Sequence, residues 1–307
     1  MRALVTGSGG FVGRFLVDHL LNSGDTVLAT DSTAQAPRSS MATGILDVTN
    51  FAQCRDVILE FKPGAVYHLA GIAFVPDAER DFDLTLKINV GGVANIYKAC
   101  NELGTNVAIV LVSSAEVYGK IEANDLPIVE ERAIRPVNSY GLSKAMAELI
   151  PPRYNHSAIS SVIARPFNHI GPGQRVEFVV SSFAQQLARI TKGLAAPVLR
   201  VGNLGARRDF CDVRDVVRAY RLGAQHGNGT YNLCSGVGVE IRAILDMLIE
   251  ISGADVSIES DPSRMRPSEI PANYGSYARA QAQLGWRPTI SLRDSLRDVF
   301  NWWVERS

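Results

Sequence analysis

The stretch Thr6-Gly7-Ser8-Gly9-Gly10-Phe11-Val12-Gly13 decides the fold of this chain. It follows the short β-branched run 2–6 and opens the segment 11–21, whose apolar residues have helical spacing. A strand, a tight glycine turn and a helix in this order point the first amides of the helix at a pyrophosphate. The stretch therefore predicts a dinucleotide site built from Gly7, Gly10, Phe11, Val12 and Gly13.

The three spaced glycines have separate expected tasks. We expect Gly7 to allow the turn, Gly10 to let a phosphate approach the backbone, and Gly13 to let the helix pack on the sheet. A glycine triplet by itself is a weak signal. The strand before it and the helix after it carry the inference.

Strand-like and helix-like segments alternate along the first half of the chain. The expected strands cover 2–6, 26–30, 65–69, 107–112 and 161–165, and the expected helices cover 11–21, 50–61 and 83–103. Apolar strands separated by helices are typical of a parallel sheet covered on both faces. The expected fold class is therefore α/β, a Rossmann-type doubly wound parallel sheet with a smaller C-terminal substrate-binding lobe.

The second half of the chain has a different pattern of expected elements. A polar loop at 166–175 is followed by expected helices at 179–192, 213–225 and 241–252 and by short expected strands at 198–201, 231–234 and 256–259. This mixture indicates a smaller lobe. We assign residues 1–165 with 206–234 to the dinucleotide-binding domain, and 166–205 with 235–307 to the substrate-binding lobe.

The composition disfavours several classes of protein. The 307 residues include 31 basic and 31 acidic side chains, and this balance disfavours a nucleic-acid partner. Hydrophobic residues make up 46%, which fits a packed core, and no apolar run reaches the length of a membrane span. The four cysteines lack metal-type spacing, so we expect buried free thiols, no metal site and a reducing, cytoplasmic location.

Asp31 ends the second expected strand, where a carboxylate can accept hydrogen bonds from the adenosine ribose and repel a 2′-phosphate. This favours NAD(H) as the cofactor. Arg14 and Arg38 can meet a phosphate, so NADP(H) stays the alternative. Asp47 and Val48 follow the next expected strand and are candidates for contact with adenine, although Asp47 is equally well explained as a loop acid.

Tyr140 and Lys144 lie four residues apart in YGLSK, which places them on one helical face. We expect the Lys144 ammonium to lower the pKa of Tyr140 and to bind a nicotinamide ribose. Tyr140 can then act as acid or base at a carbonyl or carbinol. Ser114 follows the strand 107–112, where its hydroxyl can hold the reacting oxygen. The combination with the glycine loop makes this pattern specific.

With these residues the chain resembles the extended short-chain dehydrogenases/reductases, the NAD-dependent epimerase/dehydratase group that acts on nucleotide sugars. The similarity runs through TGSGGFVG at 6–13, HLAG at 68–71, SSAEVYG at 113–119, YGLSK at 140–144, RPFNHIGPGQ at 165–174, RRDFCDVRD at 207–215 and RPSEIP at 266–271. Segments 165–174, 201–210 and 264–271 look most like the GDP-6-deoxy-D-mannose reductases. This implies NAD(P)H-dependent reduction of a nucleotide-linked 4-keto-6-deoxy sugar, from GDP-4-keto-6-deoxy-D-mannose to GDP-D-rhamnose.

The resemblance assigns roles by position. It makes Ser114 the catalytic hydroxyl, Tyr140 the proton donor and Lys144 its partner. Its HLAG segment implies cofactor contacts from Leu69, Ala70 and Gly71. The residues implied for a GDP-linked substrate are Asn168, Arg208 and Arg266 near the diphosphate, Glu269 near a ribose, and Glu116 at a sugar hydroxyl. Recognition of the base would rest on scattered contacts that a single sequence does not reveal, and Arg200 is the candidate for that region.

The same residues are also compatible with other functions. An epimerase or a 4,6-dehydratase would hold NAD tightly and recycle it. Glu116 matches the base of the dehydratases, but Ala115 stands where the dTDP-sugar enzymes carry an acid. The GDP-mannose-type dehydratases use a hydroxyl there and are disfavoured less. A catalytically silent dinucleotide-binding protein is disfavoured, because Ser114, Tyr140 and Lys144 form a complete acid–base set.

A homodimer through a helix bundle is a further implication of the resemblance. Pro151 and Pro152 follow the Tyr–Lys turn closely, and two prolines are expected to end or kink that helix. The turn itself precedes them, so the chemistry is expected to survive. A shortened or kinked helix disfavours the helix-bundle dimer interface that the resemblance implies.

Overall fold

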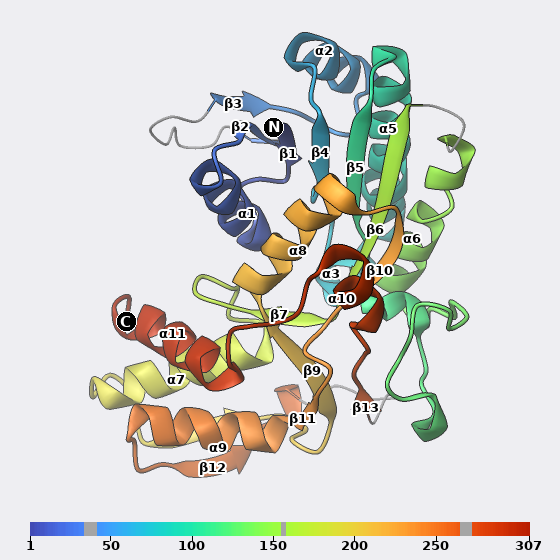
Figure 1. The fold of residues 1–307 in the computed structure, drawn as a ribbon. Helices are drawn as coiled ribbons and strands as arrows, with labels where there is room; N and C mark the ends of the chain where they lie inside the picture. The colour runs from blue at the N-terminus through green and yellow to red at the C-terminus, as the bar shows by residue number, and fades with distance from the viewer. Residues whose placement is uncertain (34–41, 155–157, 265–271) are drawn as a thin grey trace.

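A parallel seven-stranded sheet forms the larger half of the molecule (Figure 1). The computed structural model describes residues 1–33, 42–154, 158–264 and 272–307. The strand order is β10-β6-β5-β4-β1-β2-β3, and every neighbouring pair is parallel. The bounds are β1 Arg2–Thr6, β2 Thr26–Asp31, β3 Ala42–Ile45, β4 Ala65–His68, β5 Val107–Val112, β6 Ile159–Pro166 and β10 Gly229–Leu233.

Helices cover both faces of this sheet, because successive strand residues point to opposite sides. Alternate residues of β1 pack into two separate buried clusters. The first cluster includes α1 (Phe11–Asn22) and α8 (Val213–His226), and the second includes α2 (Phe51–Phe61) and α5 (Gly92–Leu103). The expected Rossmann-type doubly wound sheet is confirmed.

The smaller half, in the lower part of Figure 1, consists in its described residues of short strands and helices around a core of its own. One small sheet joins β7 (Asn168–Ile170), β9 (Arg207–Asp212), β11 (Gly238–Glu240) and β13 (Ala272–Asn273), and a second joins β8 (Val198–Val201) and β12 (Ser257–Ser260). The helices are α7 (Val179–Thr191), α9 (Ile241–Ser252) and α11 (Leu292–Val304).

The chain crosses between the two halves more than once. After β9 it returns to the large sheet through α8 and β10. The division into 1–165 with 206–234 and 166–205 with 235–307 stays a prediction, and within its first part β9 contributes to the smaller sheet. The remaining elements are α3 Val75–Arg80, α4 Phe82–Leu86, η1 Lys87–Gly91, η2 Ala115–Tyr118, η3 Ala123–Asp125, α6 Ser139–Ala147, η4 Pro151–Tyr154, η5 Pro262–Arg264 and α10 Ala278–Leu284.

Two sequence expectations about helices can be compared with these bounds. The helix expected over 83–103 is built from α4, the π-helix η1 and α5. The helix that carries Tyr140 ends at Ala147, and Pro151 opens the separate 3₁₀ helix η4. The expected end of this helix near its two prolines is confirmed.

The cysteines lie in the interior of the molecule. All four are free and buried, as expected. Within the described ranges, no helix has both the length and the apolar character that crossing a bilayer requires. In the same ranges, no group of three or more histidine, cysteine or acidic side chains is arranged to hold a metal ion.

Candidate functional site

The glycine loop joins β1 to α1 at the carboxyl edge of the large sheet. Gly7 has a φ of +70°, which glycine adopts without strain, and a Cβ there would lie 2.7 Å from the Ala70 amide nitrogen. A Cβ on Gly13 would lie 2.4 Å from the Gly7 carbonyl oxygen, so Gly13 packs against the loop itself. A Cβ on Gly10 would meet only that oxygen, at 3.3 Å, so Gly10 leaves space outside the loop.

The first turn of α1 fits a pyrophosphate. Gly10 is its N-cap, the turn holds no acidic residue, and no side chain in the described part of the chain caps it. Uncapped amides at a helix start carry partial positive charge and suit phosphate oxygens. These residues therefore fit a dinucleotide cofactor, and its binding by the amides of Phe11 and Val12 stays a prediction.

Asp31 lies against this loop at the end of β2. Its Oδ2 accepts a hydrogen bond from the Gly9 amide at 2.9 Å, and its Oδ1 accepts one from the Ser32 amide at 2.8 Å. A carboxylate offers about four acceptor positions. Asp31 therefore keeps capacity for ribose hydroxyls at the edge where a cofactor would bind.

The other candidates for the adenosine end of the cofactor are less closely placed. Asp47 is exposed, and its Oδ1 accepts from the amide and hydroxyl of Thr49 at 2.9 and 2.8 Å, which makes it a turn-forming acid here. Val48 is buried. Arg14 donates to the Gly173 carbonyl at 3.3 Å. Contacts of these residues with a cofactor stay predictions, and Arg38 lies outside the described residues.

The segment Leu69, Ala70 and Gly71 lies between the glycine loop and Lys144. The Leu69 amide donates to the Thr6 carbonyl at 3.2 Å, and the Ala70 amide lies 3.3 Å from the Thr6 hydroxyl oxygen. A Cβ on Gly71 would lie 3.6 Å from Lys144 Nζ. This segment therefore borders both the expected phosphate site and the catalytic helix.

Asn89 is a buried residue that the sequence reasoning missed. It lies in η1, where it is 1% exposed. Its Oδ1 accepts from the Ile72 amide at 2.8 Å, and its Nδ2 donates to the Ile72 carbonyl at 3.0 Å and to the Ser143 hydroxyl at 2.9 Å. Asn89 thus ties the segment after β4 to α6. Its only sequence signal is a polar residue inside a helical pattern, and π-helices often mark such sites.

The three expected catalytic side chains come together beyond the carboxyl end of β5. Ser114, Tyr140 and Lys144 are 8%, 8% and 7% exposed. Lys144 Nζ donates to the Val112 carbonyl at 2.8 Å and lies 5.9 Å from the centre of the Tyr140 ring. Ser114 forms a side-chain hydrogen bond with Tyr140, and its Oγ accepts from the Glu116 amide at 3.1 Å. This arrangement can hold and protonate a carbonyl oxygen.

The pKa of Tyr140 corrects one sequence expectation. Burial raises it to about 12, the hydrogen bond with Ser114 opposes the rise, and the charge of Glu116 adds to it. Burial lowers the pKa of Lys144 to about 8. The expected lowering of the Tyr140 pKa by Lys144 is wrong for the protein alone, because such an amine is uncharged at the pH where Tyr140 ionises. Tyr140 is therefore protonated at neutral pH.

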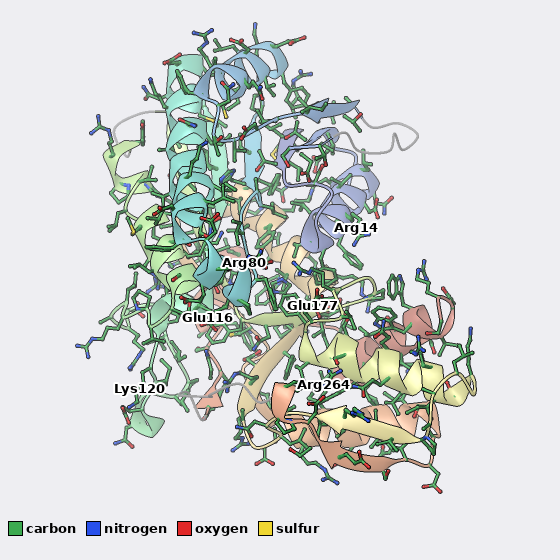
Figure 2. The ribbon with its side chains drawn as sticks, turned by 180° about the vertical axis from the view of Figure 1, so that it is seen from behind. Arg14, Arg80, Glu116, Lys120, Glu177 and Arg264 are labelled. Carbon is green, nitrogen blue, oxygen red and sulfur yellow. The ribbon has the colours of Figure 1, made fainter. Side chains whose placement is uncertain are left out.

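Glu116 lies between the catalytic helix and the smaller half, at the level where the two halves meet in Figure 2. Its Oε2 accepts from Asn138 Nδ2 at 2.9 Å. Asn138 caps α6, because its Oδ1 accepts from the Gly141 amide at 2.7 Å. The charge of Glu116 acts on both Tyr140 and Arg208. Glu116 therefore connects the proton donor to the expected substrate side.

Asn168 and Arg208 lie on the neighbouring strands β7 and β9. Asn168 Nδ2 donates to the Asp209 carbonyl at 3.1 Å. Arg208 is half-buried and donates to the Arg207 carbonyl at 2.8 Å. Burial lowers the pKa of Arg208, and the charge of Glu116 opposes that effect. Asn168 and Arg208 therefore lie on adjacent strands of the small sheet, and the basic group of Arg208 is close enough to Glu116 to feel its charge.

The structure gives no contact between the remaining substrate candidates that it describes and the residues Glu116, Asn168 and Arg208. Arg200 lies on β8, where it is exposed and lines a cavity of about 340 Å³ together with Gln186 and Glu259. Among the candidate site residues that the structure describes, no other lines that cavity. Arg266 and Glu269 lie outside the described residues. Their contacts with substrate stay predictions.

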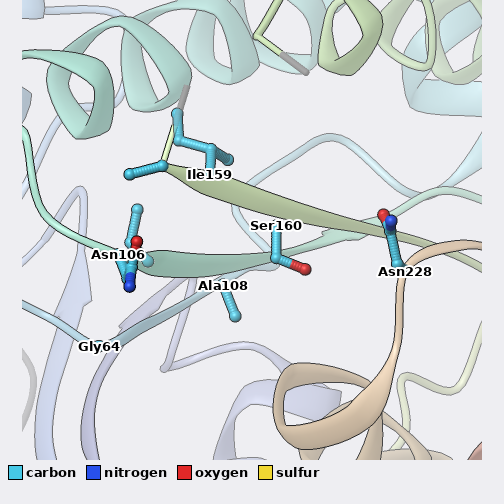
Figure 3. Close-up of a pocket in the computed structure, with 8 residues that line it drawn as sticks. Gly64, Asn106, Ala108, Ile159, Ser160 and Asn228 are labelled. Atoms are coloured by element: carbon cyan, nitrogen blue, oxygen red, sulfur yellow. The ribbon is translucent and has the colours of Figure 1, made fainter. Parts of the chain in front are cut away.

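A second cavity, of about 630 Å³, lies at the opposite edge of the large sheet (Figure 3). It is lined by residues at or just before the amino ends of β4, β5, β6 and β10, namely Gly64, Asn106, Val107, Ala108, Ala158, Ile159, Ser160 and Asn228. Ligands of open α/β sheets bind at the carboxyl ends of the strands. This cavity is therefore separate from the candidate site.

Known proteins share this architecture over the whole length of the chain. A family model described as GDP-mannose 4,6 dehydratase matches residues 4–299. The GDP-6-deoxy-D-mannose reductase of Pseudomonas aeruginosa is 38% identical over 99% of this chain and 98% of its own. The solved structure of RMD from Pseudomonas aeruginosa complexed with NADPH is 36% identical, with a TM-score of 0.87 and full coverage of both chains.

A solved structure of the UDP-glucose 4-epimerase of Thermus thermophilus in complex with NAD is 28% identical, with a TM-score of 0.87 over 99% of both chains. The family match begins in β1 and ends in α11, so it takes in the glycine loop, the Tyr–Lys helix and most of the smaller half. The sequence resemblance is thereby confirmed: the chain belongs to the GDP-mannose 4,6 dehydratase family, within the NAD-dependent epimerases and dehydratases.

Proposed function

We propose that this protein is an oxidoreductase that reduces the C4 ketone of GDP-4-keto-6-deoxy-D-mannose to give GDP-D-rhamnose. The observation that carries the proposal is the buried, protonated Tyr140 beside Ser114 and Lys144 at the carboxyl edge of the sheet. The full-length similarity to a GDP-6-deoxy-D-mannose reductase supports the choice of substrate.

Each catalytic side chain has a task in this reduction. A bound NAD(P)H supplies the hydride that C4 of the sugar receives. Tyr140 donates its proton to the C4 oxygen, and Ser114 donates a hydrogen bond to the same oxygen. The Lys144 ammonium stabilises the phenolate that Tyr140 becomes, until solvent returns the proton. A tyrosine that is protonated at neutral pH suits the reductive direction, which begins with an acid.

NADH is the cofactor that we propose, and Asp31 is the reason. Its carboxylate borders the glycine loop and keeps acceptor capacity for ribose hydroxyls, whereas it would repel a 2′-phosphate. NADPH is the alternative, and the NADPH in the structure of the Pseudomonas relative favours it.

For the nucleotide sugar, we propose contacts with the diphosphate from Arg208 and Asn168. A guanidinium on β9 beside Asn168 on β7 offers donors that suit phosphate oxygens. Arg266 completes this set, Glu269 binds a ribose, Arg200 lies near the base, and Glu116 accepts from a sugar hydroxyl.

Oxidation of NADH and of NADPH by the purified protein tests the function. We expect rapid oxidation with GDP-4-keto-6-deoxy-D-mannose and weak competition from dTDP- and UDP-linked 4-keto sugars. The product should be GDP-D-rhamnose by chromatography and NMR. Binding of all these sugars without any oxidation of either cofactor contradicts a reductase and favours a catalytically silent protein.

A nucleotide-sugar 4-epimerase or 4,6-dehydratase is the second candidate. The UDP-glucose 4-epimerase with NAD and the dehydratase family model favour it. Such an enzyme returns the hydride to its own substrate, so it retains NAD. Turnover without added reductant, by protein that carries NAD(H) through purification, would decide for this candidate and against the reductase.

The location and assembly of the protein are also part of the proposal. Four free, buried thiols support a reducing, cytoplasmic location. Leu142, Met146 and Leu149 are 41%, 38% and 74% exposed, and apolar side chains along and just beyond α6 support a homodimer through this helix.

A further inference from the structure

Glu148 lies one helical turn beyond Lys144, at the end of α6. Residues four apart share a helix face, and only 4% of the Glu148 side chain is exposed. Ser113, next to the catalytic Ser114, donates a hydrogen bond from its hydroxyl to Glu148 Oε1. Lys144 Nζ donates to the carbonyl of Val112, the last residue of β5. Two successive turns of α6 therefore hold the end of β5.

Arg165 of β6 completes the contacts of the Glu148 carboxylate. Its Nε donates to Oε1 at 3.0 Å and its Nη2 donates to Oε2 at 2.6 Å, which makes a bidentate pair. Its Nη1 donates to the Tyr118 hydroxyl at 2.9 Å and to the Glu130 carbonyl at 3.2 Å. Tyr118 ends η2, which begins just after Ser114. The pair thus joins every element that carries a catalytic side chain.

In the described part of the chain, few charged groups face the Lys144 ammonium. On α6 itself Tyr140 is protonated at neutral pH, and Glu148 at its end is paired with the Arg165 guanidinium of β6. From β4, His68 faces it, and burial together with the Lys144 charge lowers the pKa of His68 to about 3, so His68 is neutral. From β5, the Val112 carbonyl accepts its hydrogen bond. Glu148 therefore opposes the effect of burial on Lys144.

We propose that Glu148 is a positioning residue of the reduction, which fixes the Ser113–Ser114 segment against α6 and places a carboxylate one helical turn from the Lys144 ammonium. The inference rests on the proposed function, which gives Lys144 its task beside Tyr140. A buried ion pair is often no more stabilising than an apolar pair of similar volume. The pair by itself is therefore weak evidence of a role in stability, and its place one turn from Lys144 gives it a second role.

A direct titration of Lys144 by NMR tests the proposal in full-length, cofactor-free protein with carbon-13-labelled lysines. The chain has six lysines, and Lys144→Met identifies the relevant signal. In Glu148→Gln, which keeps the side-chain shape, we expect Lys144 to titrate about one pH unit lower, the response to losing an opposite charge one turn away. The alkaline limb of the kcat profile should move down by the same amount.

Glu130→Gln is the matched control. Glu130 is a buried carboxylate of the same network, but it accepts from the Asn232 amide at 2.8 Å and lies 4.0 Å from Arg279 Nε. We expect this variant to leave the Lys144 titration unchanged. The double variant Glu148→Gln/Arg165→Met avoids an unpaired buried guanidinium, which protects the test if the single variant fails to fold. It should show a smaller downward shift, because the positive charge of Arg165 is removed together with the carboxylate.

The outcomes separate this proposal from the proposed function. An unchanged Lys144 titration in a folded Glu148→Gln or double variant overturns the role of Glu148, and so does an equal shift in Glu130→Gln. A downward shift that is specific to Glu148, found in a protein that reduces no nucleotide sugar, supports the coupling and contradicts the reductase assignment instead.

Discussion

The candidate site residues at the carboxyl edge of the large sheet are more buried and more extensively hydrogen-bonded than those in the smaller half of the molecule. Ser114, Tyr140 and Lys144 are at most 8% exposed, and hydrogen bonds fix them at the end of β5 and on α6. Arg208 is half-buried and Arg200 is exposed, both on short strands. The difference teaches that the proposed proton donor is arranged before substrate arrives, whereas the groups proposed for nucleotide recognition keep freedom to adapt.

The largest effect should come from breaking the catalytic edge with Tyr140→Phe. Loss of the proton donor should lower kcat by about 10²- to 10⁴-fold, the usual contribution of a positioned acid. The cofactor should still bind, because the glycine loop is untouched. Steady-state rates and a cofactor titration by fluorescence measure the two effects separately.

A buried tyrosine outside the site controls for this change. Tyr231 is 2% exposed, and its hydroxyl bonds to Gln283 at 2.9 Å and to the Asn228 carbonyl at 3.1 Å. Tyr231→Phe should keep kcat within about twofold while costing about 1 kcal/mol of stability. Equal losses of kcat in the two variants would remove Tyr140 from its assigned role.

The next largest effect concerns the smaller half. Arg208→Ala should raise KM for the nucleotide sugar by about 10- to 100-fold, the loss of about 1.5–3 kcal/mol from hydrogen bonds to a charged group. Its kcat should change far less, because no catalytic group is removed. Arg207→Ala is the neighbouring control, since the exposed Arg207 donates to the Gly238 carbonyl at 3.1 Å. Similar KM values for the two variants would contradict the proposed diphosphate contact.

The same two regions differ in how far the sequence predicts them. The glycine loop, Tyr140 and Lys144 follow from local spacing, because a strand–turn–helix unit and one helical turn fix their positions. Ser114 follows from its place at a strand end. The residues proposed for substrate recognition are placed by contacts between segments far apart in the chain, such as Asn168 with Asp209, and spacing carries no information about those contacts.

Burial and long-range contacts also explain what the sequence reasoning missed at the catalytic edge. The Tyr–Lys spacing is correct, yet the direction of the Tyr140 pKa follows from burial, which raises it. Asn89 and Glu148 form hydrogen bonds with segments 17 and 35 residues away. Their neighbours in sequence give no sign of those partners.

A smaller effect should follow from Asp31→Asn, which changes the expected cofactor site beside the glycine loop of the large sheet. Removing the charge should lower KM for NADPH and raise KM for NADH, and so change their ratio by about tenfold, through lost repulsion and a weaker ribose contact. Asp47→Asn is the control. Asp47 bonds to its own turn, so both KM values should change together. An unaltered ratio in Asp31→Asn would mean that another group selects the cofactor.

The contact between the two regions is held at the surface by a small cluster around Arg175. Arg175 Nη1 lies 3.4 Å from Asp77 Oδ2 on α3, and its guanidinium carbon lies 5.0 Å from the centre of the Phe74 ring. Phe74 packs edge-on against Phe178 at 5.6 Å. Figure 2 shows Arg80 of α3 and Glu177 near the junction of the two halves. This cluster therefore ties the loop after β4 to the segment before α7.

Arg175→Ala should have the smallest effect, because an exposed ion pair contributes at most about 1 kcal/mol. We expect a KM for the nucleotide sugar about threefold higher, with kcat retained, and a smaller difference at high salt, where the pair is already screened. Arg242→Ala, which breaks an exposed pair within α9, is the control and should leave KM unchanged. A large loss of kcat in Arg175→Ala would contradict this expectation. It would show that the arrangement of Ser114, Tyr140 and Lys144 depends on the contact between the large sheet and the smaller half.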